Sequence, residues 1–459
     1  MTPQPIAAVI LAAGKGTRMK SRLPKVLHPI GGRPMLHHLL DTLDRLSIAR
    51  QVLVVGAAGD RVAASVADRD VAVVRQEPQS GTAHAVGVAL PALGDFSGDV
   101  LVVYGDTPLL RAGTLGALVA ARREDDAGTA PGIALLGFRP RDPGDYGRLV
   151  LDEEGRLERI VEAHEASAAE RAIGLCNSGV MVFDGALLPR LIERIGCDNR
   201  KGEYYLTDAV AIARETGRMT VVVETSEEEV LGVNSRADLA RAEAIFQRRM
   251  REKAMAEGVT LTAPETVFFS HDTTLAADVS VAPHVIFGPG VTVEGGAHIG
   301  AFSHLEGARV KAGASVGPFA RLRPGAVVGE GARVGNFVEV KNAVLEAGAK
   351  AGHLSYLGDA TIGAGANIGA GTITCNYDGF FKSRTEIGAG AFIGSNSALV
   401  APVRIGAGAI VGAGSAIAKD VPADALALTR ARQVTREGWA AAFRSRRAKE
   451  KAAAKAKKE

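Results

Sequence analysis

The stretch V-K-A-G-A-S-V-G-P-F-A-R-L-R-P-G-A-V-V-G-E-G-A-R-V-G-N-F-V-E-V, residues 310–340, has an apolar residue at every sixth position. The same period returns over residues 387–417. A helix repeats its apolar face about every 3.6 residues and a strand every 2, so a sustained period of six fits neither element alone. A short strand and a tight turn, repeated around a coil, produce this period and are typical of a parallel β-helix. We therefore expect a solenoid whose stacked apolar positions form one continuous core.

The repeat is interrupted at three places. The steps from Val340 to Leu345 and from Leu357 to Ile362 are one residue short. Over residues 372–384, T-I-T-C-N-Y-D-G-F-F-K-S-R, the period is lost. Solenoids place insertions in loops on one face, which is often the binding face. Because this segment carries asparagine, tyrosine and lysine, we expect it to be a functional loop.

Composition limits the class of protein. A chain of 459 residues with 47% hydrophobic residues predicts two or three globular domains. Its three cysteines are few, odd in number and far apart, which favours reduced thiols and a cytoplasmic location. No apolar run reaches about 18 residues, so we expect no membrane span. The first residues, M-T-P-Q-P-I-A-A-V-I-L, lack a basic start and are typical of a strand rather than a signal peptide.

The net charge of +3 is unevenly distributed. Residues 436–459 contain nine Lys or Arg and three Glu, which leaves residues 1–435 at −3. We interpret the basic end as a solubilising tail, and we expect no nucleic-acid partner because the rest of the chain has no basic stripe.

The remaining pattern divides the chain into four parts. Residues 1–232 alternate short apolar runs, at 6–11, 51–56, 71–74 and 99–106, with helical patterns at 84–93 and 114–123. This alternation predicts an α/β sheet with mostly parallel strands. Residues 233–257 predict an amphipathic connecting helix. The predicted solenoid domain then covers residues 258–435 and the tail covers 436–459.

The first predicted strand runs directly into L-A-A-G-K-G-T-R-M, residues 11–19. Its glycines allow a backbone path that exposes amide groups to an anion. Met19 stands where a dinucleotide-binding fingerprint needs its third glycine, and no Walker sequence is present. The longer string resembles the signature of sugar-1-phosphate nucleotidylyltransferases. That resemblance implies that Arg18 and Lys25, the lysine of L-P-K-V-L, hold the triphosphate.

Polar residues follow the predicted strands at the edge where open α/β sheets bind ligands. Asp106, in V-V-Y-G-D, comes just after a predicted strand, and a carboxylate there can hold Mg²⁺. The segment Q-E-P-Q-S-G-T supplies Gln76, Gly81 and Thr82, whose amide and backbone groups can read a base edge. Motifs around Gly147, Glu162, Asn177 and Asn234 follow in order.

The whole set of motifs resembles the bacterial family of bifunctional N-acetylglucosamine-1-phosphate uridylyltransferases/glucosamine-1-phosphate acetyltransferases, over residues 6–440. The acidic string is V-E-A-H-E-A here, where the family commonly has V-E-x-K-D-A. The resemblance implies Mg²⁺ on Asp106 and Asn234, uracil on Gln76 and Gly81–Thr82, and sugar on Gly147, Glu162 and Asn177. The implied residues for UTP and UDP-N-acetylglucosamine are Leu11, Ala12, Ala13, Gly14, Lys25, Gln76, Gly81, Thr82, Tyr104, Gly105, Asp106, Gly147, Glu162, Asn177 and Asn234.

For this half of the chain we expect an in-line displacement. A phosphate oxygen of N-acetylglucosamine 1-phosphate attacks the α-phosphorus of UTP, and pyrophosphate leaves. The nucleophile is already an anion, so no general base is needed. Arg18, Lys25 and Mg²⁺ are expected to neutralise charge and position the reactants.

The solenoid half resembles the left-handed β-helix of hexapeptide-repeat acyltransferases, which are usually trimers. The segment G-H-L-S-Y-L-G-D, residues 352–359, contains His353, which the family resemblance identifies as the general base that deprotonates the amine of glucosamine 1-phosphate. The amine then attacks the thioester of acetyl-CoA. The resemblance assigns the sugar phosphate to Arg323, Lys341, Tyr356, Asn367 and Lys382, and acetyl-CoA to Ala370, Asn376, Tyr377, Ser395, Ala413 and Arg430. Arg430 lies in L-T-R-A-R-Q, where the family often has S-R-x-P-Q.

The resemblance thus implies a cytoplasmic homotrimer that makes UDP-N-acetylglucosamine for peptidoglycan and lipopolysaccharide, without a membrane or nucleic-acid partner. Two alternatives remain at this point. One is a monofunctional nucleotidylyltransferase whose solenoid only oligomerises, as in ADP-glucose pyrophosphorylases. The other is a scaffold or metal-binding solenoid of the γ-carbonic-anhydrase type, which needs two histidines five apart, whereas His298 and His304 are six apart.

Overall fold

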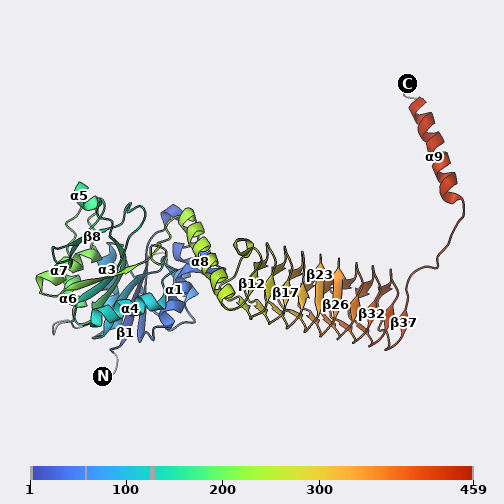
Figure 1. The fold of residues 1–459 in the computed structure, drawn as a ribbon, viewed down its shortest axis with the longest axis horizontal. Helices are drawn as coiled ribbons and strands as arrows, with labels where there is room; N and C mark the ends of the chain where they lie inside the picture. Colours follow the sequence, from blue (N-terminus) through green and yellow to red (C-terminus); the bar gives the residue numbers. More distant parts are fainter. Residues whose placement is uncertain (1–3, 57–58, 125–129, 457–459) are drawn as a thin grey trace. The chain divides into compact units, whose positions relative to one another are not determined.

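The computed structural model describes residues 4–56, 59–124 and 130–456, and the chain divides into two compact units (Figure 1). Unit 1 comprises Met1–Ala256 with Phe268–Thr273, and unit 2 comprises Glu257–Val267 with Thr274–Glu459. The first is built around one mixed sheet, and the second around three parallel sheets.

Unit 1 is built on a mixed sheet with the strand order β11-β7-β10-β6-β1-β4-β5. The predicted apolar runs form β1, β4, β5 and β6, which are mutually parallel and confirm the α/β prediction. Strand β10 is antiparallel to both of its neighbours, β6 and β7, an arrangement that the sequence pattern did not predict. The strands are β1 (Ile6–Ala12), β4 (Arg50–Val55), β5 (Ala72–Arg75), β6 (Asp99–Tyr104), β7 (Ile133–Phe138), β8 (Arg148–Leu151), β9 (Leu157–Val161), β10 (Cys176–Asp184) and β11 (Thr220–Thr225), with β2 (Pro29–Ile30) and β3 (Arg33–Pro34) forming a separate ribbon.

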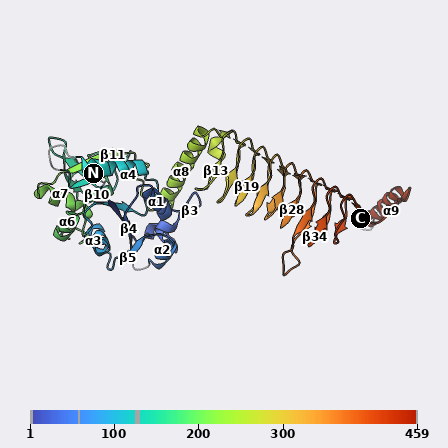
Figure 2. The ribbon, with the colours of Figure 1, turned by 90° about the horizontal axis from the view of Figure 1, so that it is seen from below.

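Helices cover both faces of this sheet (Figure 2). One face packs against α3, α6 and α7, and the other against α1, α2 and α4. The central strands are buried on both sides, which explains why β1 reads as an uninterrupted apolar run. The helices are α1 (Met35–Asp44), α2 (Asp60–Ser65), α3 (Thr82–Leu93), α4 (Ala112–Arg123), α5 (Ala168–Arg171), α6 (Leu188–Arg194), α7 (Ala209–Glu215) and α8 (Arg236–Ala256), with short 3-10 turns η1 (Thr17–Met19), η2 (Lys25–Leu27) and η3 (Leu206–Asp208).

Helix α8 belongs to the fold of unit 1. Its Ala242 and Ile245 are buried in a small core with Ile30 and Met35. Gln247 is almost fully buried and exchanges two hydrogen bonds with the backbone of Phe269, at 2.7 and 2.8 Å. These contacts fix the middle of α8 within unit 1.

Unit 2 is the predicted parallel β-helix. Figure 1 shows its short strands stacked in successive coils, and they form three parallel sheets. The apolar residues at the six-residue spacing, such as Val316, Leu322 and Val328, are fully buried. Each strand pairs with the strand one coil later, as in His298 with Ser315 and Ser315 with Arg333.

Successive strands of unit 2 contribute to the three sheets in turn. The first sheet contains β12 (Thr260–Leu261), β14 (Ser280–Val281), β17 (His298–Ile299), β20 (Ser315–Val316), β23 (Arg333–Asn336), β26 (Lys350–His353), β29 (Asn367–Ile368), β32 (Phe392–Ile393), β35 (Ile410–Val411) and β37 (Leu426–Ala427). The second contains β13 (Thr274–Leu275), β16 (Thr292–Val293), β19 (Ala308–Val310), β22 (Ala326–Val328), β25 (Val344–Leu345), β28 (Ala360–Ile362), β31 (Thr385–Ile387) and β34 (Val403–Ile405). The third contains β15 (Ile286–Phe287), β18 (His304–Leu305), β21 (Arg321–Leu322), β24 (Glu339–Lys341), β27 (Tyr356–Gly358), β30 (Ile373–Cys375), β33 (Ala398–Val400) and β36 (Ala416–Ile417); η4 (Pro264–Thr266) and α9 (Trp439–Ala456) lie outside them.

The predicted loop at residues 372–384 begins later than expected. Strand β30 stays in its sheet and pairs with β33, so the prediction was wrong for its first residues. Thr374 occupies the position six residues after Ile368 and is fully buried, with its hydroxyl bonded to the backbone of Gly358. The six-residue period of apolar residues is not visible in the sequence here, because the inward position is occupied by a polar residue. The loop itself covers residues 376–384 and projects from the stack of strands in Figure 2.

The end of the described chain is the exposed helix α9, which has no buried residue. Residues 457–459 of the predicted tail lie outside the described residues. Across the part of the chain that is described, no helix is both long and apolar enough to cross a bilayer. Cys176, Cys197 and Cys375 are all free cysteines.

Candidate functional sites

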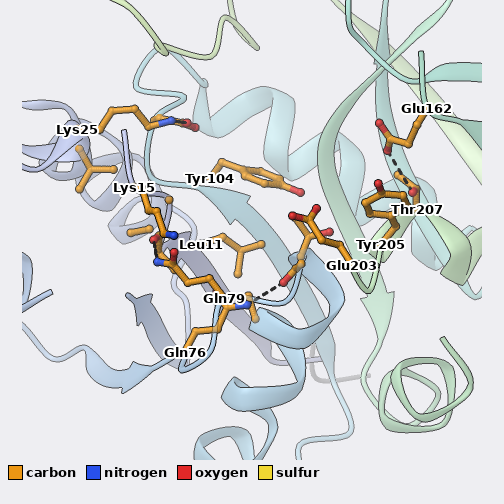
Figure 3. A pocket seen from close by; sticks show the side chains of 18 of the residues that line it. Leu11, Lys15, Lys25, Gln76, Gln79, Tyr104, Glu162, Glu203, Tyr205 and Thr207 are labelled. Atoms are coloured by element: carbon orange, nitrogen blue, oxygen red, sulfur yellow. Dashed lines mark hydrogen bonds and ion pairs between the residues drawn. The ribbon is translucent and has the colours of Figure 1, made fainter. Parts of the chain in front are cut away.

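A cavity of about 610 Å³ opens in unit 1 at the carboxyl ends of β1 and β6 (Figure 3). The predicted residues that line it are Leu11, Ala12, Ala13, Gly14, Lys25, Gln76, Gly81, Thr82, Tyr104, Asp106, Glu162 and Asn177. Four other predicted residues of this site, Arg18, Gly105, Gly147 and Asn234, lie outside the lining. The structure therefore brings most of the predicted first site around one cavity.

Three predicted charged or polar side chains converge at one end of this cavity. The Lys25 ammonium donates a hydrogen bond to the Asp106 carboxylate and another, of 3.0 Å, to Oδ1 of Asn234. The backbone fixes the same neighbourhood, because the Val233 amide donates to the Asp106 carbonyl at 2.9 Å. Asn234 thus belongs to the site through Lys25 although it does not line the cavity.

The glycine-rich turn fits against the segment that carries Lys25. Gly16 has a φ of +61°, and a side-chain carbon placed there would lie 2.8 Å from Cβ of Lys25. A glycine is needed at this close approach. Arg18 lies on the 3-10 turn η1, exposed to solvent.

Gly81 lets two distant segments meet at the wall of the cavity. It has a φ of +109°, and a side-chain carbon there would lie 2.4 Å from the Tyr204 carbonyl oxygen. The Gln76 side chain donates from Nε2 to the Gly81 carbonyl at 2.8 Å, and Oγ1 of Thr82 accepts from the Leu206 amide at 3.0 Å. These contacts tie the predicted base-binding segment to residues 204–206.

The remaining wall is acidic and aromatic. Thr207 donates a hydrogen bond of 3.4 Å to the Glu162 carboxylate, and Figure 3 shows this pair across the cavity from Lys25, with the Tyr104 ring between them. Burial raises the pKa of Glu162 above its ordinary value, against the opposing effect of the nearby His164. Burial also raises the pKa of Tyr205 to about 12.

Two further predicted residues make backbone hydrogen bonds to residues that line the cavity. The Gly147 carbonyl accepts from the Asn177 amide at 2.8 Å, and the Gly105 amide donates to the Leu11 carbonyl at 3.0 Å. His164, which stands where the family commonly has lysine, lies with its Nε2 3.4 Å from the Tyr205 hydroxyl. This contact shows that the change in the acidic string reaches the wall of the cavity.

Sequence reasoning missed several lining residues. They are Lys15, Val26, Gln79, Ala85, Glu203, Tyr205 and Thr207. Three of them belong to E-Y-Y-L-T-D, residues 203–208, a run of polar and aromatic residues that follows no strand. That run was the available signal, but nothing in the sequence indicated that Gly81 would bring it to the cavity.

In unit 2, the residues predicted to hold a sugar phosphate lie on consecutive coils. Arg323 follows β21 and donates to Glu339 of β24 at 2.9 Å, and Glu339 pairs in register with Tyr356 of β27. Lys341 ends β24. Glu339 was not predicted, and its contact with Arg323 places a carboxylate among these basic side chains.

His353 ends β26 and is exposed to solvent, directly before the turn that leads to Tyr356. It pairs in register with Asn336. Asn367 lies in the next strand of the same sheet but pairs with Lys350 rather than with His353. Tyr356 and Lys341 lie on the paired strands β27 and β24, whereas Asn367 lies one strand further along the sheet that contains His353.

The residues predicted to bind acetyl-CoA fall into two groups. Asn376 and Tyr377 begin the loop, which closes through a hydrogen bond of 2.9 Å from the Ser383 amide to the Asn376 carbonyl and a bridge between Tyr377 and Lys382. The second group follows one corner of the coils. In this group Ala370, Ser395 and Ala413 accept hydrogen bonds on their carbonyls from Asn396, Gly414 and Arg430 respectively.

The γ-carbonic-anhydrase alternative makes a prediction about metal ligands. His298 and His304 lie in different sheets, on β17 and β18, and do not form the pair that a γ-carbonic-anhydrase site needs. Among the described residues, no group of three or more His, Cys, Asp or Glu side chains is arranged to hold a metal ion. In unit 1, oxygens of Asp106 and Asn234 both accept hydrogen bonds from the Lys25 ammonium group.

Comparison with known proteins gives two domain matches. Residues 8–173 match the MobA-like NTP transferase domain, and residues 384–419 match the bacterial transferase hexapeptide with six repeats. These matches agree with the fold of unit 1 and with the coils of unit 2.

Whole-chain relatives agree with both matches. The chain is 61% identical to a bifunctional protein GlmU of Rhodospirillum rubrum, over 96% of this chain and 97% of that protein. It is 59% identical to the one of Rhizorhabdus wittichii, over 99% and 100% respectively. It is 56% identical to the one of Paramagnetospirillum magneticum, over 98% and 99%. With both domains present and the likeness extending over nearly the whole length, the chain belongs to the GlmU family of bifunctional proteins.

Proposed function

We propose that the cavity of unit 1 is the uridylyltransferase site of this bifunctional enzyme and that the solenoid around His353 is its acetyltransferase site. The two reactions together make UDP-N-acetylglucosamine from glucosamine 1-phosphate, acetyl-CoA and UTP. One observation carries the first assignment: Lys25, Asp106 and Asn234 converge beside the glycine-rich turn at one end of the cavity. Such a cluster suits a polyphosphate, which needs cations and a metal at one place.

The residues present fit a magnesium ion. The Asp106 carboxylate and the Asn234 amide oxygen both reach one cationic atom, the Lys25 ammonium nitrogen, so the two oxygens converge on a single point of positive charge. Mg²⁺ favours a site with one or two protein oxygens that is completed by substrate phosphates. Asp106 and Asn234 would hold the ion, which, when bound, would neutralise developing charge on the triphosphate.

The protein's own part in uridylyl transfer is positioning and charge. The backbone of residues 11–14 lines the cavity and supports the nucleotide, and Lys25 and Arg18 supply positive charge for the phosphates. Gln76 donates its amide nitrogen to Gly81, which leaves its amide oxygen as an acceptor for a base N–H. The phosphate oxygen of N-acetylglucosamine 1-phosphate then attacks the α-phosphorus in line, and pyrophosphate leaves.

The acidic wall suits the sugar. Asn177 and Glu162 line the cavity, Glu162 on the side away from Lys25 (Figure 3), and the Gly147 carbonyl accepts from the Asn177 amide. The half-buried Glu162 carboxylate, which accepts a hydrogen bond from Thr207, is also an acceptor for a sugar hydroxyl. Because it lies away from the phosphate-binding end, its charge does not oppose binding of the nucleotide.

For acetyl transfer, His353 takes a proton from the amine of glucosamine 1-phosphate, and the free amine attacks the thioester carbonyl of acetyl-CoA. Arg323, Lys341 and Lys382 attract the sugar phosphate, with Tyr356 and Asn367 as further contacts. Asn376, Tyr377, Ala370, Ser395, Ala413 and Arg430 hold acetyl-CoA. The supporting observation is that His353 is exposed at the end of β26, directly before the turn to Tyr356, whose strand pairs with the strand that ends at Lys341.

We infer a homotrimer, because His353 lies open on one chain and a second copy would enclose it, as in other hexapeptide-repeat acyltransferases. The three free cysteines and the substrates favour a cytoplasmic location. We also propose the functional division 1–232, 233–257, 258–435 and 436–459. In this division the helical segment completes the first site, since Asn234 directly precedes α8.

Two assays on one preparation test the assignment. Release of pyrophosphate from UTP and N-acetylglucosamine 1-phosphate reports the first site, and release of the CoA thiol from acetyl-CoA and glucosamine 1-phosphate reports the second. We expect Asp106→Ala to abolish pyrophosphate release and to leave thiol release near wild type, because the sites lie in different units. Asp95→Ala, at an exposed aspartate before β6, is the matched control and should change neither rate. A large fall in both activities of folded Asp106→Ala would contradict the two-site assignment.

A further inference from the structure

Three polar residues form a column on the solenoid at a spacing of one coil: Asn342, Asp359 and Asn376. They follow β24, β27 and β30 of one sheet. Nδ2 of Asn342 donates to Oδ1 of Asp359 at 2.6 Å, and Nδ2 of Asn376 donates to Oδ2 of the same carboxylate. One aspartate therefore binds the side chains of the coils before and after its own.

Asp359 is held firmly in this column. It is 6% exposed and has a φ of +48°, a left-handed conformation that aspartate tolerates better than most residues. Its amide donates to the Lys341 carbonyl at 3.0 Å, and its carbonyl accepts from the Thr385 amide at 3.1 Å. Thr385 is the first residue after the loop, so Asp359 ties both ends of the loop to the coil.

The electrostatic surroundings keep Asp359 ionised. Burial alone would raise the pKa of its carboxyl group. Hydrogen bonds from Asn342 and Asn376, together with the charges of Lys341 and Lys382, outweigh burial and lower that pKa below its ordinary value. At neutral pH Asp359 is thus a carboxylate that can only accept hydrogen bonds.

This acceptor fixes which way the Asn376 amide points. Its nitrogen must face Asp359, and its Oδ1 has no hydrogen-bond partner among the described residues. A carboxamide oxygen in that state accepts an N–H donor. The pantetheine arm of CoA carries two amide groups with N–H donors, whereas its carbonyl oxygens would need a donor from the protein.

We propose that Asp359 is a positioning residue for acetyl transfer, which orients the Asn376 amide so that its oxygen receives a pantetheine N–H of the acyl donor. This role rests on the proposed function, because it takes Asn376 as part of the acetyl-CoA site. It adds a residue that touches no substrate and acts through another. The sequence signal was the 17-residue spacing of Asn342, Asp359 and Asn376.

The test exchanges the carboxylate of Asp359 and the carboxamide of Asn376. In Asp359→Asn, the new amide oxygen still accepts from Asn342, so its nitrogen faces Asn376 and the Asn376 amide must turn over. We expect the KM for acetyl-CoA to rise about tenfold, the usual worth of one hydrogen bond, with a change in kcat below about threefold. In the double variant Asp359→Asn with Asn376→Asp, the amide at position 359 donates to the carboxylate at position 376. The second oxygen of that carboxylate is again an acceptor for the pantetheine N–H, so KM should return to within about threefold of wild type.

Matched controls separate this role from a general loss of stability. Asp278→Asn makes the same chemical change at another left-handed aspartate of the coils, which is exposed, and should leave the KM for acetyl-CoA unchanged. Pyrophosphate release by unit 1 and the circular-dichroism melting curve report that each variant is folded. The proposal is overturned when folded Asp359→Asn keeps the wild-type KM, or when the double variant is no better than Asp359→Asn.

The proposed function fails in a different way. If Asn376 is not part of the acetyl-CoA site, Asn376→Ala leaves the KM for acetyl-CoA unchanged. If the solenoid is not an acetyltransferase, wild-type protein releases no CoA thiol. Either result is read before the Asp359 variants are compared, so the two failures cannot be confused.

Discussion

Thr374→Val should destabilise the coils, because it removes a side-chain hydroxyl that accepts a hydrogen bond from a buried backbone amide. Oγ1 of Thr374 accepts from the Gly358 amide at 2.8 Å and donates to the Gly358 carbonyl at 3.0 Å, in a fully buried position. Valine has nearly the same shape, so the core stays filled. The Gly358 amide is left buried without its partner, which costs about 1–3 kcal/mol.

Thr385 provides a control for which the change in the free energy of unfolding should have the opposite sign. It is also fully buried, but its Oγ1 has no hydrogen-bond partner among the described residues. Replacing it with valine removes an unpaired hydroxyl from the core, so Thr385→Val should be neutral or stabilising by about 1 kcal/mol. The same chemical change at two threonines should therefore shift the free energy of unfolding in different directions.

The measurement has to report on the coils themselves. The single tryptophan, Trp439, lies in the exposed helix α9, so its fluorescence is a poor probe of their unfolding. Hydrogen exchange followed by mass spectrometry suits the question. A loss of about 1–3 kcal/mol speeds exchange of the segment containing Gly358 by roughly 5- to 150-fold in Thr374→Val. Equal effects in both variants would refute the reasoning, since they would show that the hydroxyl's partners do not matter.

Three further predictions follow from the sites. His353→Ala should lower acetyl transfer by about 10²–10⁴-fold with little change in the KM for acetyl-CoA, and its pH–rate profile should lose the histidine limb while keeping that of the substrate amine; a retained limb would assign the base elsewhere. Gly81→Ala should raise the KM for UTP about tenfold or more. The added carbon would lie 2.4 Å from the Tyr204 carbonyl oxygen, at a positive φ that costs about 1–3 kcal/mol. Gly155→Ala, also at positive φ but with open space around it, should leave this KM unchanged. Glu162→Gln should raise the KM for the sugar phosphate and also raise Tm at pH 7. Because the pKa of Glu162 is raised in the folded state, its carboxyl group stabilises the fold below the unfolded pKa of about 4.3, and this stabilisation is lost as pH rises through the folded pKa. The gain in Tm should therefore vanish near pH 4.

The fold could be predicted from the sequence where a repeat was long and regular. Val310, Val316 and their successors marked the inward face of the coils, and the buried strands of unit 1 gave continuous apolar runs. The pattern failed at Thr374, because a side chain that satisfies a backbone amide looks polar in the sequence while serving the core. It also failed to show that β10 runs antiparallel, since strand direction depends on distant partners.

The candidate sites were predictable where short motifs resemble a family and not where tertiary structure brings segments together. Lys25 and Asp106 each stood in a motif, and their side chains form a hydrogen bond in the structure. Thr207 and Tyr205 reach the same cavity only because Gly81 allows a close contact with Tyr204. Asp359 stood in the quoted string beside His353, but its partners lie one coil away on either side, so no local pattern could indicate its role.

The loop at residues 376–384 has a consequence for how such a chain can diverge over generations. Strands β30 and β31, on either side of it, keep their register with β33 and β34, so the coil continues as though the loop were absent. Phe380 and Phe381 at its tip expose 87% and 76% of their surface. Doubling the length of a flexible loop adds only about 0.6 kcal/mol of closure entropy. Insertions and substitutions at this tip should therefore change the stability of the fold very little. Natural selection can then change what the loop recognises while the inherited scaffold stays the same.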